Sequence, residues 1–323
     1  MDIIEERKTN CHSKIVEIKE QISVFETISN LSSLSIYVTG SYGRLEASEH
    51  SDLDVFFIHE GSEKNDRVSN IEKTLLDAEL IKMCREMEFP ELSGDARYLN
   101  IHYLDDLLDN LGSPADDYKN YFTARMLLIL ESICIHNKDT YIEIVKKIME
   151  SYYRDYHDHE TDFIPVFLVN DIIRFWKTLC LNYEHKRNRE QKDENEKNKA
   201  HLKNLKLKFS RLMTCFSMVL LLSKNQEVIE PSDLMTYIEM SPLERLQIIS
   251  NTISRKELYL EIIGEYEWFL KKTGYEKNEV LKWISIRNNR DEAFEHARDF
   301  GIHFYKLLQE VCKENNSMRY LTI

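Results

Sequence analysis

The segment GSYGRLEASEHSDLDVFFI, residues 40–58, decides the fold that we expect for this chain. It follows a β-like run, LSIYV, and it begins with Gly40 and Gly43, two of only eight glycines in 323 residues. It ends in a second apolar run that is entered through Asp52 and Asp54. A carboxylate at the entry of a buried strand must be paired, hydrated or bound to a ligand. The segment is therefore the first candidate for chemistry.

The two aspartates alternate with apolar residues. In a strand, alternate side chains point the same way, so Asp52 and Asp54 face one side while Leu53 and Val55 face the other. Two carboxylates held in parallel repel each other unless a cation lies between them or one takes a proton. Magnesium prefers oxygen ligands and is completed by water and substrate phosphates, and a pair of such ions stabilises both oxygens of an in-line displacement. We interpret Asp52 and Asp54 as ligands of Mg²⁺ or Mn²⁺.

The glycine turn supplies a second half of the predicted site. A glycine that ends a strand permits a tight turn and lets a ligand approach the main chain. A helix that begins near Ser41 presents N–H groups and the positive end of its dipole to an anion. Arg44, one turn further on, reaches a phosphate or pairs with the acidic site. Gly-Ser and Asp-x-Asp are each common in solvated loops, but their order between two strands, ten residues apart, is much more specific.

This pattern resembles the signature of the nucleotidyltransferase superfamily of the polymerase-beta type. It is most similar to the bacterial protein-modifying branch, which includes the uridylyltransferase of the nitrogen-signalling protein and the adenylyltransferase of glutamine synthetase. By this resemblance, Gly40 and Ser41 bind the triphosphate, and the two aspartates bind the metal ions. The matching residues are Gly40, Tyr42-Gly43-Arg44, Glu46 and Ser51-Asp52-Leu53-Asp54.

The resemblance also implies a third carboxylate on a later strand, which helps to deprotonate the acceptor hydroxyl. The predicted strand RYLNIHY carries His102 at the place where that acid is expected. We expect Asp95, just before the strand, to serve as the third carboxylate, with Asp117 as the second candidate. His102 as the base, or a catalytically dead site, are the alternatives.

The rest of the chain predicts an α+β protein: a small mixed-sheet nucleotidyltransferase domain followed by a larger all-helical domain. Short β-rich runs at 34–39 and 53–58, a helical period at 68–87 and the strand above indicate the small domain. From Asp116 onward almost every segment has helical periodicity, beginning with a helix over 118–136. The expected division is an N-terminal helix at 1–30, a catalytic domain at 31–112 and a helical domain at 113–323.

The segment FLVNDIIRFWKTLCLNYEHKR, in the helical half, carries a polar face. Asn170, Arg174 and Lys177 are spaced four and three residues apart, so on a helix they share one side. We expect Arg174 and Lys177 to bind the nucleotide's triphosphate from the second domain. The alternative is that Arg174 pairs with Asp171, or with an acid on a neighbouring helix such as Glu131.

The composition of the chain limits the classes of partner that we expect it to bind. The formal net charge of −13 and a pI near 5.4 disfavour general binding to nucleic acids or anionic membranes. Six scattered cysteines fit reduced thiols better than a disulfide framework. The charged start MDIIEERKTN lacks a signal-peptide core, and the longest apolar run is about half the ~20 residues that a membrane span needs. We expect a cytoplasmic protein without a membrane partner.

These observations predict a metal-dependent nucleotidyltransferase. It would transfer NMP from ATP or UTP to a hydroxyl on a protein or small molecule and release pyrophosphate. One alternative within the superfamily is an RNA-modifying or cyclic-nucleotide-producing enzyme. Another is a catalytically silent module that binds a nucleotide for regulation or neutralises a toxin.

Overall fold

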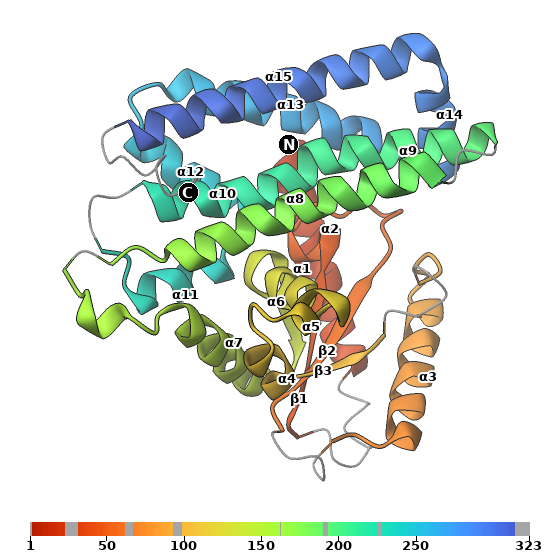
Figure 1. Cartoon of the computed structure of the whole chain (residues 1–323). Coiled ribbons are helices and arrows are strands. Elements are labelled where there is room, and N and C mark those ends of the chain that lie inside the picture. Colours follow the sequence, from red (N-terminus) through yellow and green to blue (C-terminus); the bar gives the residue numbers. More distant parts are fainter. Residues whose placement is uncertain are drawn as a thin grey trace. The chain divides into compact units, whose positions relative to one another are not determined.

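A computed structural model describes residues 2–22, 32–61, 67–92, 99–161, 163–189, 193–224 and 228–313. The chain forms two compact units, Met1–Arg154 and Asp155–Ile323. The first unit contains a four-stranded sheet with helices, and the described part of the second unit consists of helices and their connections (Figure 1). The α+β architecture, with a helical region after a small sheet domain, is confirmed. Within the described residues, every helix is too short or too polar to cross a lipid bilayer.

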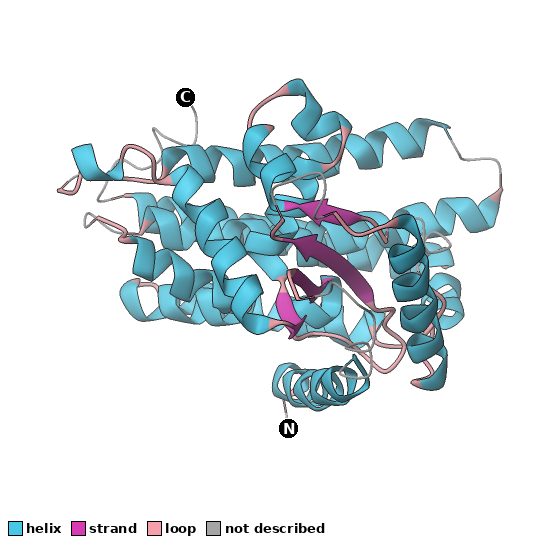
Figure 2. Cartoon of the chain, turned by 90° about the horizontal axis from the view of Figure 1, so that it is seen from below, coloured by secondary structure: helices cyan, strands magenta, loops and turns pink. Residues whose placement is uncertain are grey.

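The sheet of the first unit, whose strands are magenta in Figure 2, has the strand order β3-β2-β1-β4. β1 is antiparallel to both of its neighbours, whereas β2 and β3 are parallel, so the sheet is mixed as predicted. The strands are β1 (Leu34–Thr39), β2 (Asp54–His59), β3 (Ile101–Tyr103) and β4 (Ile133–His136).

The register of the β1–β2 pair brings the two ends of the glycine-aspartate motif together. Thr39, the last residue of β1, lies opposite Asp54, the first residue of β2. The short helix α2 (Gly40–Gly43) follows β1 directly. The start of the glycine turn and the second aspartate therefore lie side by side, although fourteen positions separate Gly40 from Asp54 in the sequence.

Helices α1 (Ile3–Ile22) and α3 (Asn70–Glu86) pack on one face of the sheet and form its main core. The core residues of β1 and β2 alternate along each strand, as the two-residue period of a strand requires. A capping box at Ser69 and Glu72 begins α3. The buried residues of this core include Ile15, Ile18, Leu34, Ile36, Val38, Leu53, Val55, Phe57, Leu76 and Leu80.

The other face of the sheet carries a row of aromatic rings. Tyr37 of β1 stacks on Phe56 of β2 with ring centroids 5.7 Å apart. Tyr141, on helix α7 (Lys138–Tyr152), lies 6.2 Å from the Tyr37 ring. Helices α6 (Tyr121–Glu131) and α7 both pack against β1. The remaining helices of this unit are α4 (Leu104–Asp109) and α5 (Pro114–Tyr118).

The predicted continuous helix over 118–136 is wrong. α6 ends at Glu131, and β4 follows it and pairs with β1, with Ile133 opposite Val38. Ile135 then joins the core under α1 and α3, because sheet pairing and burial outweigh the helical pattern of the preceding residues. The first compact unit includes α6 and β4 and extends to Arg154.

The second unit is built around α10, which is buried along nearly its whole length and packs against α8, α12 and α15. An uninterrupted apolar helix of this kind belongs in a core. A π-helical turn, η4 (Leu207–Arg211), precedes it and places Phe209 against the ring of Phe269 at 4.7 Å. The other elements are η3 (Tyr156–Asp158), α8 (Val166–Arg189), α9 (Glu194–Lys206), α10 (Leu212–Ser223), α11 (Pro231–Glu239), α12 (Pro242–Thr252), α13 (Lys256–Thr273), α14 (Lys277–Ser285) and α15 (Arg287–Cys312).

Candidate functional site

Gly40 and Gly43 bound a turn that packs against two neighbouring segments without room for a side chain. Gly40 has a φ of +66°, in the left-handed region that favours glycine. A Cβ atom at Gly40 would overlap Oδ2 of Asp54, and one at Gly43 would overlap the main-chain oxygen of Glu131. The glycines therefore bring the main chain into direct contact with a carboxylate on one side and with the end of α6 on the other.

The helix expected near Ser41 is present, but it has only four residues. Its dipole is correspondingly small, so an anion at this turn would be bound mainly by hydrogen bonds from the main-chain N–H groups. The N–H groups of a first helical turn have no intrahelical acceptors. The turn is closed by hydrogen bonds from the Arg44 N–H to the Gly40 oxygen at 3.1 Å and from the Glu46 N–H to the Ser41 oxygen at 2.9 Å. Ser41 itself is half-buried and adds a hydroxyl donor to this turn.

Residues 52–55 alternate between half-buried aspartates and fully buried apolar side chains. Leu53 and Val55 are 2% and 4% exposed and belong to the core, whereas Asp52 and Asp54 keep partial access to solvent. β2 begins at Asp54, so Asp52 lies two residues before the strand. The pKa of the Tyr42 hydroxyl in α2 is raised mainly by burial and, to a smaller extent, by nearby negative groups that include Asp52. Both carboxylates therefore lie near the glycine turn.

The donor set of this site fits a magnesium ion that takes most of its ligands from water and a substrate. Two protein carboxylates are the usual number for such an ion, with phosphate oxygens completing the shell. Among the described residues, no group of three or more histidine, cysteine or acidic side chains forms a ready-made metal cage.

The guanidinium of Arg44, a predicted phosphate ligand, is only 7% exposed and is held between two buried carboxylates. Its Nη1 donates to Oε2 of Glu131 at 2.7 Å, and its Nε donates to Oε1 of Glu46, also at 2.7 Å. Arg7 of α1 donates to the main-chain oxygen of Glu46 at 2.8 Å. The turn is thus anchored to α1 and α6 by buried charged hydrogen bonds.

The expected third carboxylate, Asp95, lies outside the described residues. The second candidate, Asp117, is exposed on α5. Its neighbour Asp116 is fully buried and binds Arg125 through two hydrogen bonds of 3.0 and 2.7 Å, which makes it a structural residue of α5 and α6. Asp106 pairs with Arg67 at 3.1 Å.

His102, the alternative base, is buried in the aromatic row. Its ring stacks on Phe56 with centroids 6.2 Å apart, and its side chain belongs to β3. Burial lowers the pKa of His102 to about 4, and the charge of Asp106 opposes this shift only in part. A histidine with such a low pKa is a weak general base at neutral pH.

Lowering the pH should therefore destabilise the protein through His102. The unfolded chain binds a proton near the usual pKa of 6.5, and the folded chain binds it only near 4, so the free energy of unfolding falls as the pH decreases through that window. Urea unfolding from pH 7.5 to 4 measures this slope. His102→Phe, which keeps an aromatic ring on Phe56, should flatten it, whereas replacing exposed His12 by glutamine should not. Equal slopes in wild type and His102→Phe would contradict the assignment.

Arg174 and Lys177 lie on α8 in the second unit. Nη1 of Arg174 donates to Oδ1 of Asp171 at 3.3 Å, which is one of the alternatives weighed from the sequence. Lys177 is exposed and Arg174 is half-buried. Glu131, the other acid weighed from the sequence, accepts from Nη1 of Arg44 at 2.7 Å.

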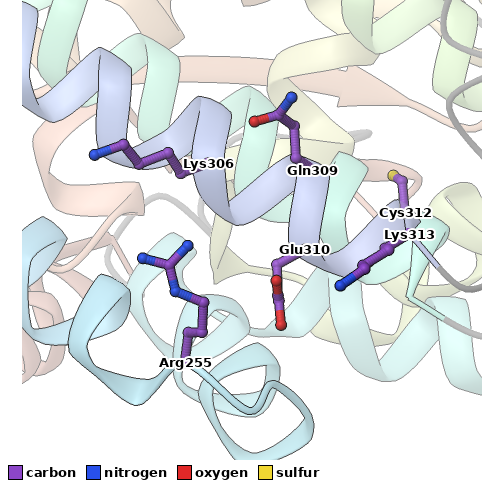
Figure 3. Close-up of a pocket in the computed structure, with 6 residues that line it drawn as sticks. All are labelled: Arg255, Lys306, Gln309, Glu310, Cys312 and Lys313. Carbon is purple, nitrogen blue, oxygen red and sulfur yellow. The ribbon is translucent and has the colours of Figure 1, made fainter.

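A shallow pocket of about 470 Å³ occurs in the second unit. Figure 3 shows Arg255 and Glu310 extending from facing segments, with Lys306 and Lys313 along α15. None of the residues predicted for the nucleotide site lines it. Its long side chains are mostly exposed, so it has no buried polar group that would define a ligand.

A comparison with protein families matches one segment of the first unit. Residues 18–105 match the nucleotidyltransferase domain family. The matched segment contains the glycine turn, both aspartates, β1, β2 and β3. It supports the superfamily predicted from the motif, and with it NMP transfer from an NTP as the general chemistry. A comparison with curated proteins found no match.

Two parts of the site were not foreseen from the sequence. β4 lies beyond the matched segment, and Glu131 lies 87 positions after the arginine that it binds. The signal in the sequence is a single acid, Glu131, at the end of the apolar run MLLIL. A lone acid in that position indicates a buried partner without identifying it.

Proposed function

We propose that this chain is a metal-dependent nucleotidyltransferase that transfers NMP from ATP or UTP to a hydroxyl group and releases pyrophosphate. The acceptor is a protein or a small molecule, as in the protein-modifying branch that the motif resembles. The observation that carries the proposal is the contact between the glycine turn and the Asp54 carboxylate, with Asp52 close to the same turn.

The roles of the residues follow from their chemistry. Asp52 and Asp54 hold Mg²⁺ or Mn²⁺, which, when bound, neutralises charge that develops on the phosphate oxygens. The N–H groups of the turn at Gly40 and Ser41, with the Ser41 hydroxyl, bind the phosphates of the nucleotide. A half-buried location strengthens these interactions because it lowers the local dielectric.

The remaining assignments are the acid that accepts a proton and the cations of the second unit. Asp95 is the acid that would accept the proton of the acceptor hydroxyl. Arg174 and Lys177 are cations that would bind the triphosphate. An excess of negative charge over the whole chain favours an acceptor other than a nucleic-acid backbone. The sequence also leads us to propose a cytoplasmic location.

Binding and transfer are tested separately. Titration calorimetry with ATP or UTP and Mg²⁺ should show binding, and incubation with each α-labelled NTP should transfer label. Label on protein or a small hydroxyl compound supports the proposed reaction. Label on RNA, or in a cyclic nucleotide, supports the alternatives within the superfamily, and binding without transfer supports a silent regulatory module. If the protein binds no NTP, the proposed function and each alternative that requires a nucleotide are wrong.

A further inference from the structure

The glycine turn rests on a buried cluster of four charged residues from three distant segments. We call Arg7, Arg44, Glu46 and Glu131 the turn clamp. Their exposures are 9%, 7%, 5% and 2%, and their formal charges cancel. Arg44 lies at the centre, with Glu46 on one side and Glu131 on the other.

Glu131 contacts the turn twice. Its carboxylate accepts from Arg44 at 2.7 Å, and its main-chain oxygen occupies the space where a side chain at Gly43 would lie. Glu131 is also the last residue of α6, directly before β4, which pairs with β1. The end of α6 is therefore fixed to the sheet from which the glycine turn emerges.

A buried cluster of this kind is a costly way to stabilise a fold. Apolar residues of similar size often give equal or greater stability than a buried ion pair, because charges lose their hydration when buried. Charged hydrogen bonds are short and directional, so they restrict the positions of the groups that they join. The turn clamp holds the segment that carries Gly40 and Ser41 at a defined distance from Asp54.

We propose that Glu131 is a positioning residue for the nucleotide site, acting through Arg44 and Gly43 on the glycine turn. The inference depends on the proposed function, since it assigns the turn to the phosphates. It gives Arg44 a role different from the one predicted from the motif: its guanidinium binds two carboxylates and orients the turn, while the N–H groups of the turn meet the anion. It also extends the site to residue 131, beyond the matched segment that ends at 105.

The test compares Glu131→Gln with Asp116→Asn in the full-length chain. Both remove one negative charge from a buried arginine pair with an N–O distance of 2.7 Å, and α6 carries one partner of each pair. Both variants should unfold at a lower temperature than wild type. At a temperature where circular dichroism shows all three proteins folded, calorimetry should give a Kd for ATP or UTP with Mg²⁺ that is weaker on the order of 10-fold for Glu131→Gln alone.

The outcomes separate this inference from the proposed function. If wild type binds no NTP, the proposed function fails. If wild type binds and Glu131→Gln binds equally well, or Asp116→Asn loses as much affinity, the positioning role is overturned. If Glu131→Gln does not fold, Glu131→Asp replaces it in the test; this variant keeps the charge but shortens the side chain by one methylene. Binding equal to wild type in Glu131→Asp, or an equal loss of affinity in Asp116→Asn, would then overturn the positioning role. Gly43→Ala, which displaces the turn from the Glu131 oxygen, should weaken binding in the same way.

Discussion

Replacing Asp52 and Asp54 together by asparagine should abolish nucleotide transfer and leave the fold intact. The amide keeps the size of each side chain but removes the charge that holds the metal ion. Metal ions supply several kcal/mol of transition-state stabilisation, so the rate of transfer should fall about a thousandfold or more. The measurement is single-turnover transfer of label from an α-labelled NTP at saturating Mg²⁺.

The stability of the same variant provides an independent check. Added Mg²⁺ should raise the unfolding temperature of wild type and not that of the variant. Asp139→Asn, the same chemical change at an exposed position, is the control and should retain transfer. Full activity in the double variant would refute the assignment of the metal site.

The second large effect is expected for Gly40→Ala. The φ of +66° makes any side chain at this position strained, and the new methyl group would overlap Oδ2 of Asp54. Either the turn or the carboxylate must move, and misplacement of a reacting group by ~1 Å can cost about 100-fold in rate. Overpacking adds about 1–3 kcal/mol to the loss of stability. Transfer assays and urea unfolding of the same preparation measure the two effects.

Gly112→Ala is the matched control for this substitution. Gly112 has a φ of +76°, but no atom lies within 4 Å of the position of its Cβ. The control variant should therefore lose only about 1–2 kcal/mol of stability, from backbone strain in the left-handed region, and should keep its transfer activity. If Gly40→Ala folds and transfers as well as Gly112→Ala does, the close contact between the turn and Asp54 has no catalytic importance.

Much of the first unit could be predicted because its signals are local. The β1 and β2 runs are short, apolar and bounded by loop residues, and the glycine–aspartate motif lies between them within twenty residues. The superfamily could be inferred from these few positions, and the family comparison supports it. Nucleotidyl transfer could be predicted as the general chemistry because it depends on residue types at a fixed spacing, and both are visible in the sequence.

The role of Arg44 could not be decided in this way. As a cation beside a glycine turn it fits a phosphate ligand, and only the folded chain shows it buried between Glu46 and Glu131. Electrostatic pairing depends on distance in space: Glu46 lies two positions from Arg44 in the sequence, whereas Glu131 lies 87 positions away. The same reason explains why Arg174 was weighed against two acids, of which the structure pairs it with Asp171.

Periodicity along the chain was enough to indicate β1, β2 and β3, most helices and the place of the acidic motif, because each depends on residues that are close in sequence. The end of α6, the strand β4, the extent of the first unit and the anchoring of the glycine turn were decided only in three dimensions. The pairing of β4 with β1 and the contact of Arg44 with Glu131 join segments 87 or more positions apart, where local propensity is outweighed by contacts that a linear pattern does not contain.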